Sequence, residues 1–240
     1  MIFDFHVHVG QFNERYFSPE FVCKTLKYAG ITDFAFSSTS HIISDDKCFL
    51  LKEREKVLEI TKNHAHLFQW LTPDMLANTR LLDFWLDKNV EGLKFQGRAY
   101  SWGPFSKSLE KIFAIAVERK LPILIHTGED KKVRPTDYLK MCQKYKDVKV
   151  ILGHGRPLEL VIPVLRECPN TYVDTAFMPG KEIKTLCSLG YKKRILFGTD
   201  APIPKLFYKS SLTQYLKKRI LTVQKLGVDI SNAKNLLCKN

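Results

Sequence analysis

The sequence predicts an α/β fold of the (β/α)8 class, a TIM barrel, because eight strand-like runs alternate with helix-like runs. The strands start about 27 residues apart on average, as expected for consecutive strand–helix units. Parallel strands pair through such crossovers, and 240 residues suit a single barrel. We therefore expect residues 1–240 to form one domain, a regular or slightly distorted barrel. The predicted strands are Ile2–Val7, Asp33–Ser37, Leu67–Leu71, Val90–Phe95, Pro122–Ile125, Lys149–Leu152, Thr171–Asp174 and Arg194–Phe197.

The segments between the strands carry the start and stop signals of helices. In the first, Ser18 can cap the helix, Pro19 and Glu20 suit its first turn, and Gly30 ends it. Further helices are predicted at residues 47–63, 77–88, 107–119, 135–145, 157–166, 179–188 and 209–226. A doubly wound open sheet is the structural alternative. It is disfavoured because no glycine-rich dinucleotide turn follows the first strand.

Composition argues against a secreted or membrane-spanning protein. The chain is 45% hydrophobic, which suffices for a large core. Yet it has no run of about 18 apolar residues and no leader-like pattern of basic and apolar residues. Its six cysteines are scattered without a Cys-x-x-Cys pair, as is typical of reduced thiols. We therefore expect a cytoplasmic protein that does not associate with membranes.

The net charge of +13 raises the question of nucleic-acid binding. Residues 181–240 contain 13 basic and three acidic side chains, so the excess lies mainly in this segment. We interpret it as a solvated, lysine-rich helical face. No aromatic side chains alternate with the lysines to form a stacking platform for bases, so we expect no nucleic-acid partner. A basic rim that attracts a small anionic substrate is the lesser alternative.

The motif His6-Val7-His8 is the most informative feature of the chain. Alternate residues of a strand point to the same side, so the two imidazoles lie roughly 6.6 Å apart along the strand. Two neutral imidazoles can then bind one metal ion at about 2.0–2.1 Å each. An isolated pair of this kind is more often a surface or capped pair. The motif therefore needs support from the rest of the chain.

That support comes from three other predicted strands, which end at His126, His154 and Asp200. Strands 1, 5, 6 and 8 of a closed barrel present their carboxyl ends at one mouth, so these residues would converge there. Taken alone, His126 or His154 is better interpreted as a hydrogen-bonded histidine of the barrel with a structural role. Asp200 alone could be a helix N-cap. The joint pattern favours a metal site.

In this order the motifs resemble those of the amidohydrolase superfamily. More narrowly, they resemble its metal-dependent TIM-barrel branch that includes aminocarboxymuconate-semialdehyde decarboxylase. The resemblance extends over essentially the whole chain. The matching motifs are His6-Val7-His8, Ile-His126-Thr-Gly, Leu-Gly-His154-Gly, Phe-Gly-Thr-Asp200-Ala-Pro, Glu91-Gly-Leu-Lys94-Phe, Tyr-Val-Asp174-Thr and Asn232-Ala233.

The resemblance implies that His6, His8, His126 and Asp200 hold one divalent ion. Zinc is the favoured ion and manganese the alternative. Such an ion lowers the pKa of its bound water towards 7 and polarises a substrate oxygen. The resemblance gives His154 the role of general acid or base, since an imidazole titrates near neutral pH, and it makes Asp200 catalytic as well.

Lys94 has three interpretations. Alternation with outward-facing Leu93 and Phe95 points it into the barrel, where a buried ammonium needs an anionic partner or a shifted pKa. It can bind a substrate carboxylate. In dinuclear relatives a lysine at this position is carboxylated and bridges two ions, which makes a second metal a lesser alternative here. The remaining interpretation is a structural salt bridge with Asp4 or Asp174.

Substrate contacts are expected from the loops that follow the strands. Arg98 and Trp102 lie after the fourth strand and Arg156 after the sixth. Arginine binds carboxylates in a bidentate manner and aromatic walls suit planar acids, so we expect a small anionic substrate. The loops after strands 1 and 5 are short, which predicts a shallow pocket unless a second subunit closes it. A homodimer would meet that need.

Three classes of function remain. The leading one is a metal-dependent hydrolase that uses metal-activated water on a C–N, C–O or lactone bond of a carboxylate-bearing compound. Non-oxidative decarboxylation uses the same ligands and is not separated from hydrolysis by the sequence. A TatD-type deoxyribonuclease shares the paired histidines, but Lys94 stands where that group has a metal-binding glutamate. A binding protein on an inactive barrel is disfavoured, since every predicted ligand is present.

Overall fold

The computed structural model describes residues 1–62, 64–100 and 106–237. Within these ranges, nine strands form one sheet in the order β2-β1-β3-β4-β5-β6-β7-β8-β9, parallel throughout except for β1 with β2. This arrangement confirms the predicted barrel class. The strands are β1 (Phe3–Phe12), β2 (Arg15–Phe17), β3 (Asp33–Ser38), β4 (Ala65–Trp70), β5 (Val90–Phe95), β6 (Ile123–His126), β7 (Val150–Gly153), β8 (Thr171–Asp174) and β9 (Ile195–Leu196).

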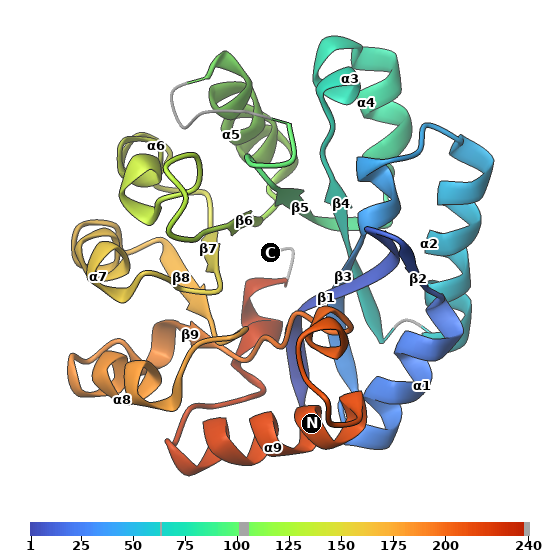
Figure 1. The fold of residues 1–240 in the computed structure, drawn as a ribbon. Helices are drawn as coiled ribbons and strands as arrows, with labels where there is room; N and C mark the ends of the chain where they lie inside the picture. Colours follow the sequence, from blue (N-terminus) through green and yellow to red (C-terminus); the bar gives the residue numbers. More distant parts are fainter. Residues whose placement is uncertain (63, 101–105, 238–240) are drawn as a thin grey trace.

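Helices surround the strands as an outer ring (Figure 1). The α-helices are α1 (Pro19–Ala29), α2 (Lys47–Thr61), α3 (Pro73–Ala77), α4 (Thr79–Trp85), α5 (Lys107–Arg119), α6 (Leu139–Lys144), α7 (Leu158–Glu167), α8 (Gly180–Ser188) and α9 (Leu212–Lys225). Short 3-10 helices lie at η1 (Thr39–Ile42), η2 (Pro135–Tyr138), η3 (Lys192–Arg194), η4 (Ile203–Leu206) and η5 (Asn232–Leu236). Among the described residues, no helix is both long enough and apolar enough to cross a membrane.

Three features of the chain differ from the sequence prediction. The helix expected at residues 135–145 begins as the 3-10 helix η2 and continues as α6. β2 was not predicted, because it is only three residues long and forms an antiparallel hairpin with the extended end of β1. The helix expected at residues 77–88 is preceded by an unpredicted short helix, α3 (Pro73–Ala77), and is itself α4 (Thr79–Trp85). Asn78 ends α3, and its side chain accepts a hydrogen bond from Leu81 N to cap α4. A polar cap residue thus interrupts an otherwise helical pattern.

The barrel closes where β1 meets the chain that follows β9. Three backbone hydrogen bonds make this junction: Phe5 N to Phe197 O at 2.8 Å, Asp200 N to His6 O at 2.8 Å, and His8 N to Ala201 O at 2.7 Å. We call this junction, between residues 4–8 and 197–201, the seam. It joins the first and last strands of the barrel.

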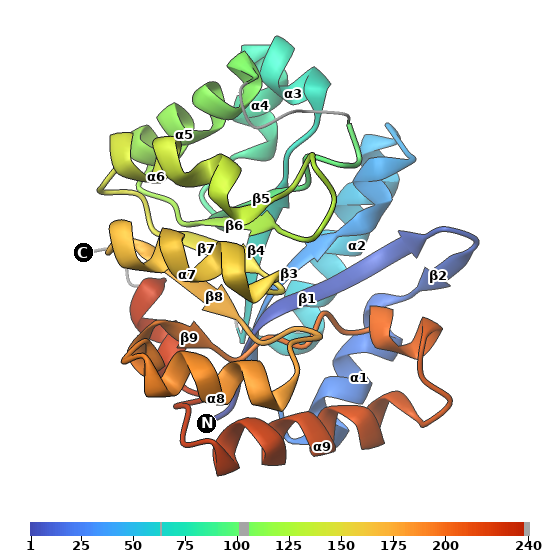
Figure 2. The same ribbon diagram turned by 60° about the vertical axis from the view of Figure 1, so that its left-hand side comes forward.

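The interior of the barrel is filled with apolar side chains at its amino-terminal end. Phe3, Phe5, Ala35, Phe68, Leu124, Ile151 and Leu196 form this inner core together with Ala233 and Leu237. The last two belong to the C-terminal segment, which lies in the middle of the strand ring in Figure 1. In Figure 2 this segment lies at the end of the barrel opposite to the tip of β1. Side chains thus fill the amino-terminal end of the barrel, and the carboxyl-terminal end remains available for a functional site.

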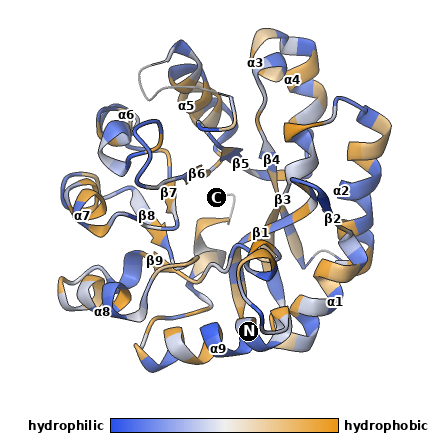
Figure 3. Ribbon diagram, in the orientation of Figure 1, coloured by the Kyte–Doolittle hydropathy of each residue, from blue (hydrophilic) through white to orange (hydrophobic). Residues whose placement is uncertain are grey.

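The outer core lies between the strands and the helices. In α5, for example, Leu109, Ile112, Phe113 and Ala116 are buried on one face. Leu93 and Phe95 of β5 face this outer core, which confirms the expected alternation around Lys94. Figure 3 shows the same division, with hydrophobic and hydrophilic residues alternating around the helices.

A β-bulge in β1 changes which side chains face the barrel interior. Asp4 pairs with Phe34 and Val7 with Phe36, so Phe5 and His6 together oppose a single residue of β3. A bulge of this kind puts two successive side chains on nearly the same face. Phe5 therefore belongs to the inner core, and His6 still points into the barrel. Strict alternation would have sent these two neighbours to opposite faces.

Gly92 on β5 makes room for the ring of Phe68 in the inner core. A Cβ atom at this position would lie 2.3 Å from Phe68 Cε1, far inside van der Waals contact. We expect Gly92→Ala to lower the free energy of unfolding by about 1–3 kcal/mol, the usual cost of overpacking. Urea denaturation would measure this change.

The control for this prediction is a double-mutant cycle with Phe68→Leu. Leucine lacks Cε1 and Cζ, the two ring atoms nearest the added Cβ, so the double variant should be more stable than the sum of the two single changes predicts. Additive effects would show that the packing of Gly92 against Phe68 is not the cause.

Candidate metal centre

Three of the predicted metal ligands lie together at the seam. His6 Nε2 is 3.1 Å from His8 Nε2 and 3.3 Å from Asp200 Oδ1, and His8 Nε2 is 3.1 Å from the same carboxylate oxygen. All three side chains are buried. The two histidines come from the bulged half of β1, whereas Asp200 follows β9 on the other side of the seam.

The spacing of these three donor atoms fits a metal ion. Ligands about 2.0–2.1 Å from a tetrahedral ion lie about 3.3–3.4 Å apart, close to the three separations observed here. Two neutral imidazoles and one carboxylate are also a suitable donor set for zinc and its neighbours. The residues therefore fit the divalent ion that the sequence predicts.

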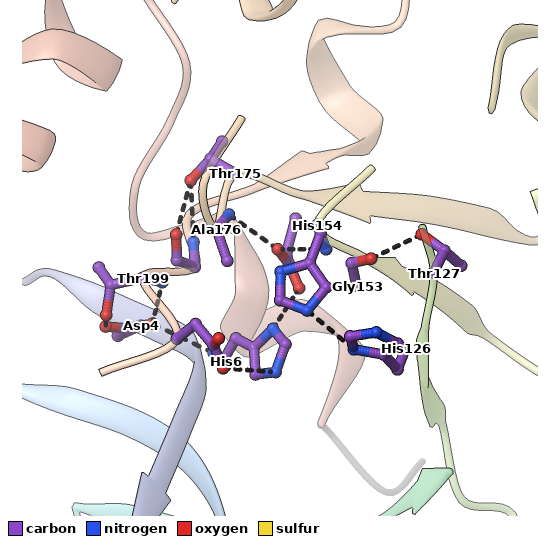
Figure 4. Close-up of polar contacts among 12 residues, drawn as sticks. Asp4, His6, His126, Thr127, Gly153, His154, Thr175, Ala176 and Thr199 are labelled. Atoms are coloured by element: carbon purple, nitrogen blue, oxygen red, sulfur yellow. Dashed lines mark hydrogen bonds and ion pairs between the residues drawn. The ribbon is translucent and has the colours of Figure 1, made fainter. Parts of the chain in front are cut away.

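His154, which was expected at the same barrel mouth, lies beside this group. One donor atom from each of His6, His154 and Asp200 lies within 4.8 Å of the other two. His126 contacts the group through His154, with 3.0 Å between His126 Nδ1 and His154 Nε2 (Figure 4). Among the described residues, the buried Nδ1 of His154 has no hydrogen-bond partner. The assignment of His126 as a fourth ligand stays a prediction.

Asp174, at the end of β8, orients His6. Its Oδ2 is 2.8 Å from His6 Nδ1, and its Oδ1 accepts hydrogen bonds from His154 N at 3.0 Å and Ala176 N at 2.8 Å. A carboxylate only accepts, so His6 carries its proton on Nδ1 and leaves the Nε2 lone pair free for a cation. For His8 the corresponding acceptor is the carbonyl oxygen of Ser37, 3.3 Å from His8 Nδ1, and Ser37 Oγ lies 2.9 Å from the same nitrogen.

Sequence reasoning noted Asp174 only as part of a family motif and as a partner for Lys94. The signal that could have identified its role was its position. Asp174 is a lone acidic residue at the carboxyl end of a barrel strand. The predicted metal ligands also stand at the carboxyl ends of their strands.

Burial sets the protonation states of the site. It lowers the pKa of His6, His126 and His154 well below the usual range, with nearby Lys94 adding to the effect at His6 and His126. It raises the pKa of Asp174 to about 6, although two backbone N–H groups oppose the shift. At neutral pH these imidazoles are therefore uncharged, which is the form that binds metals.

Lys94 also points into the site. It is 1% exposed, and its Nζ lies 3.1 Å from His6 Nε2 and 5.9 Å from the centre of the Trp70 ring. Burial lowers the pKa of Lys94 to about 8, although Asp200 and Asp174 favour its charged form. Neither Asp4 nor Asp174, both in the described part of the chain, lies within ion-pair distance of Lys94. The structure thus places Lys94 beside His6, His8 and Asp200, and not in the salt bridge that was one of its three interpretations.

A cavity of about 750 Å³ opens beside this group, which is in the usual range for a small-molecule site. The predicted substrate-binding residues Lys94, Arg98 and Arg156 line it. Trp102 lies outside the described residues. Sequence reasoning missed the aromatic wall formed by Phe177, Phe207 and Tyr208, because these side chains follow β8 and β9 at positions without a recognisable motif.

The chain belongs to the Amidohydrolase family, whose sequence profile matches residues 4–229. It is therefore an enzyme, and the family resemblance of its motifs is confirmed. A comparison with curated protein sequences finds no match. The family assignment rests on the profile and agrees with the fold.

Solved structures with the same fold include three relatives of low sequence identity. A probable 2-pyrone-4,6-dicarboxylic acid hydrolase from Acinetobacter baumannii, with citric acid bound, has a TM-score of 0.70 at 9% identity, covering 99% of this chain and 96% of its own. The IDCase of Metarhizium anisopliae has 0.70 at 13%, covering 99% and 97%. An amidohydrolase from Burkholderia multivorans with bound zinc has 0.68 at 13%, covering 99% and 96%. These likenesses show the fold.

Asp174→Asn tests the orientation of His6. The new amide group would donate towards His6 Nδ1, which favours the tautomer with its proton on Nε2, where a metal would bind. We expect the affinity for zinc to fall at least 10–100-fold, the usual effect of losing such a partner. Competition with a chromophoric chelator measures it.

The matched control is Asp33→Asn, which alters another carboxylate 3.1 Å from a histidine, His64, outside this group. It should leave zinc affinity unchanged. Equal zinc affinity in Asp174→Asn and the unaltered protein would contradict the assigned role.

Proposed function

We propose that this enzyme is a metal-dependent hydrolase that acts on a C–N, C–O or lactone bond of a small, carboxylate-bearing compound. The observation that carries the proposal is the cluster of His6 Nε2, His8 Nε2 and Asp200 Oδ1, 3.1–3.3 Å apart. Lys94 and two arginines surround it in one cavity. A bound divalent ion, with zinc preferred, would supply an acidified water and a Lewis acid.

The residues of the chain have separate tasks in this proposal. His6, His8 and Asp200 hold the ion, with His126 as the further predicted ligand. His154 is uncharged at neutral pH and lines the cavity, so it can accept a proton from water and return it to the leaving group. Asp200 contacts both histidines and lines the cavity, where its carboxylate can also orient the attacking water.

The two arginines support a substrate with a carboxylate. Arg98 Nε is 3.7 Å from Asp130, and Arg156 Nε is 3.9 Å from Glu129. Both separations exceed hydrogen-bond distance, so these acids leave the guanidinium groups able to bind an anion in a bidentate manner. Arg156 also lies over the ring of Phe177, 5.9 Å from its centre. The aromatic wall of Phe177, Phe207 and Tyr208 suits a flat, apolar part of the same substrate.

Decarboxylation of a similar acid is the second candidate. Lys94 favours it, because a cationic amine 3.1 Å from His6 Nε2 could place a substrate carboxylate directly beside the ion. The IDCase of Metarhizium anisopliae shares the fold. Release of CO2 with loss of the carboxylate, without ring opening, distinguishes this reaction from hydrolysis. A nuclease is disfavoured, since the cavity suits a small molecule.

Metal analysis combined with a substrate screen tests the proposal. We expect about one divalent ion per chain, and hydrolysis of a member of a panel of lactones, cyclic amides and aryl carboxylates that is lost on chelation. Single-stranded DNA serves as the negative substrate. Full turnover by metal-free protein would refute the metal site, and preferred turnover of DNA would refute the substrate class.

His154→Asn sharpens this test by separating metal binding from proton transfer. The variant should keep most of its metal while kcat falls by about 10²–10⁴, the usual scale of general acid–base catalysis. Loss of metal in proportion to activity would instead show that His154 is a ligand.

Arg98→Met and Arg156→Met test the charge of the substrate. Each should raise KM for a carboxylate-bearing substrate by roughly 10–100-fold, because a charge-assisted hydrogen bond contributes about 1.5–3 kcal/mol. The effect should largely vanish for a neutral analogue. Lys217→Glu with Lys218→Glu, both exposed on α9, is the control and should change only the salt dependence of kcat/KM. Equal effects on charged and neutral substrates would exclude a carboxylate clamp.

A further inference from the structure

Asp4 lies at the seam and contacts both of its sides. It is 0% exposed, and its carboxylate accepts three hydrogen bonds. Oδ1 accepts from His6 N at 3.1 Å and from Thr199 N at 3.0 Å, and Oδ2 accepts from Thr199 Oγ1 at 2.5 Å. Figure 4 shows these contacts beside His6. All three partners are donors, which only an acceptor side chain can satisfy.

These contacts fix His6, on β1, relative to Asp200, which follows β9. The first holds the bulge that turns His6 into the barrel. The other two hold Thr199, whose neighbour Asp200 supplies the carboxylate ligand. Thr199 Oγ1 also accepts from Ala201 N at 3.2 Å, so the turn around Asp200 is hydrogen-bonded to the same cluster. One carboxylate thus links the histidine strand to the aspartate turn.

Both elements need such a constraint. Asp200 has a φ of 58°, a left-handed conformation that is strained for a residue other than glycine and persists only when its surroundings enforce it. The bulge leaves one residue of β1 unpaired with β3, so the ladder alone does not hold His6. The side chain of Asp4 stabilises both irregularities.

We propose that Asp4 is a positioning residue that sets the spacing of His6, His8 and Asp200 before any metal binds. Its importance for metal binding rests on the proposed function, whereas its effect on the spacing does not. Asp4 does not touch the ion or the substrate in this proposal. It acts through the backbone of His6 and of Thr199.

The test compares Asp4→Ala with Asn170→Ala. Asn170 is also buried, and its Nδ2 donates to the carbonyl groups of Cys142, Tyr145 and Val148 at 2.9–3.2 Å. Asn170 precedes β8, at the opposite end of the barrel from His6, His8 and Asp200. Both variants remove a buried side chain that makes three hydrogen bonds, so both should lower Tm. Only Asp4→Ala should alter the site.

Three measurements report directly on the metal-binding residues. In a metal-free crystal of Asp4→Ala, the separation of His6 Nε2 from Asp200 Oδ1 should exceed the present 3.3 Å. Amide exchange of His6 and Thr199 should be faster than in Asn170→Ala. The affinity for Co2+ alone should fall about 10–100-fold, with a changed visible spectrum, while Asn170→Ala keeps the original affinity and spectrum.

Thr199→Val and Thr199→Ser cover the case in which Asp4→Ala does not fold. Valine removes the contact with Asp4 Oδ2 and the hydrogen bond from Ala201 N, and leaves both contacts of Asp4 Oδ1 in place. It should weaken Co2+ binding, and serine should restore it. Unchanged ligand spacing and exchange in Asp4→Ala, or a loss of Co2+ affinity equal to that of Asn170→Ala, would overturn the proposal. If the unaltered protein binds no metal, the proposed function fails, and the crystal and exchange measurements still decide the role of Asp4.

Discussion

Closure of the barrel at the seam is the constraint on which the candidate site depends. β9 has only two residues, so three backbone hydrogen bonds between β1 and residues 197–201 complete the ring. His6 and His8 lie on one side of this junction and Asp200 lies on the other. Opening of the seam would separate the two histidines from the carboxylate. The bonds that close the fold therefore also assemble the site.

Burial then determines the chemistry that the assembled residues can perform. Removal from water favours the uncharged imidazoles of His6 and His154 and raises the pKa of Asp4 to about 7 and that of Asp174 to about 6. Such a cluster is costly to bury unless each group has a partner. Backbone N–H groups and the neighbouring histidines supply most of these partners, and a cation would complete the arrangement. Irregular backbone at His154 and Asp200 adds to the cost, as is common at functional sites.

Much of the fold was predictable because its signals are local. The alternation of strand and helix patterns predicted all eight barrel strands, and Ser18 and Gly30 do cap α1 as expected. The short strand β2 and the short helix α3 before Asn78 were not predicted, since each depends on a few residues that lack a periodic pattern. In the site, alternation correctly placed Lys94 inside the barrel. It could not show that Lys94 would lie beside His6 rather than form a salt bridge.

The sequence by itself determined the chemical groups available and the strand ends at which they stand. An i, i+2 histidine pair faces one side because strands have a period of two, and parallel strands bring their carboxyl ends to one mouth. Only the tertiary structure decided which donor atoms meet. The bulge at Phe5 and His6, the seam between residues far apart in the chain, and the hydrogen bonds of Asp4 and Asp174 all depend on contacts between distant segments. No local sequence pattern encodes these contacts, because they form only when distant segments meet in the closed barrel.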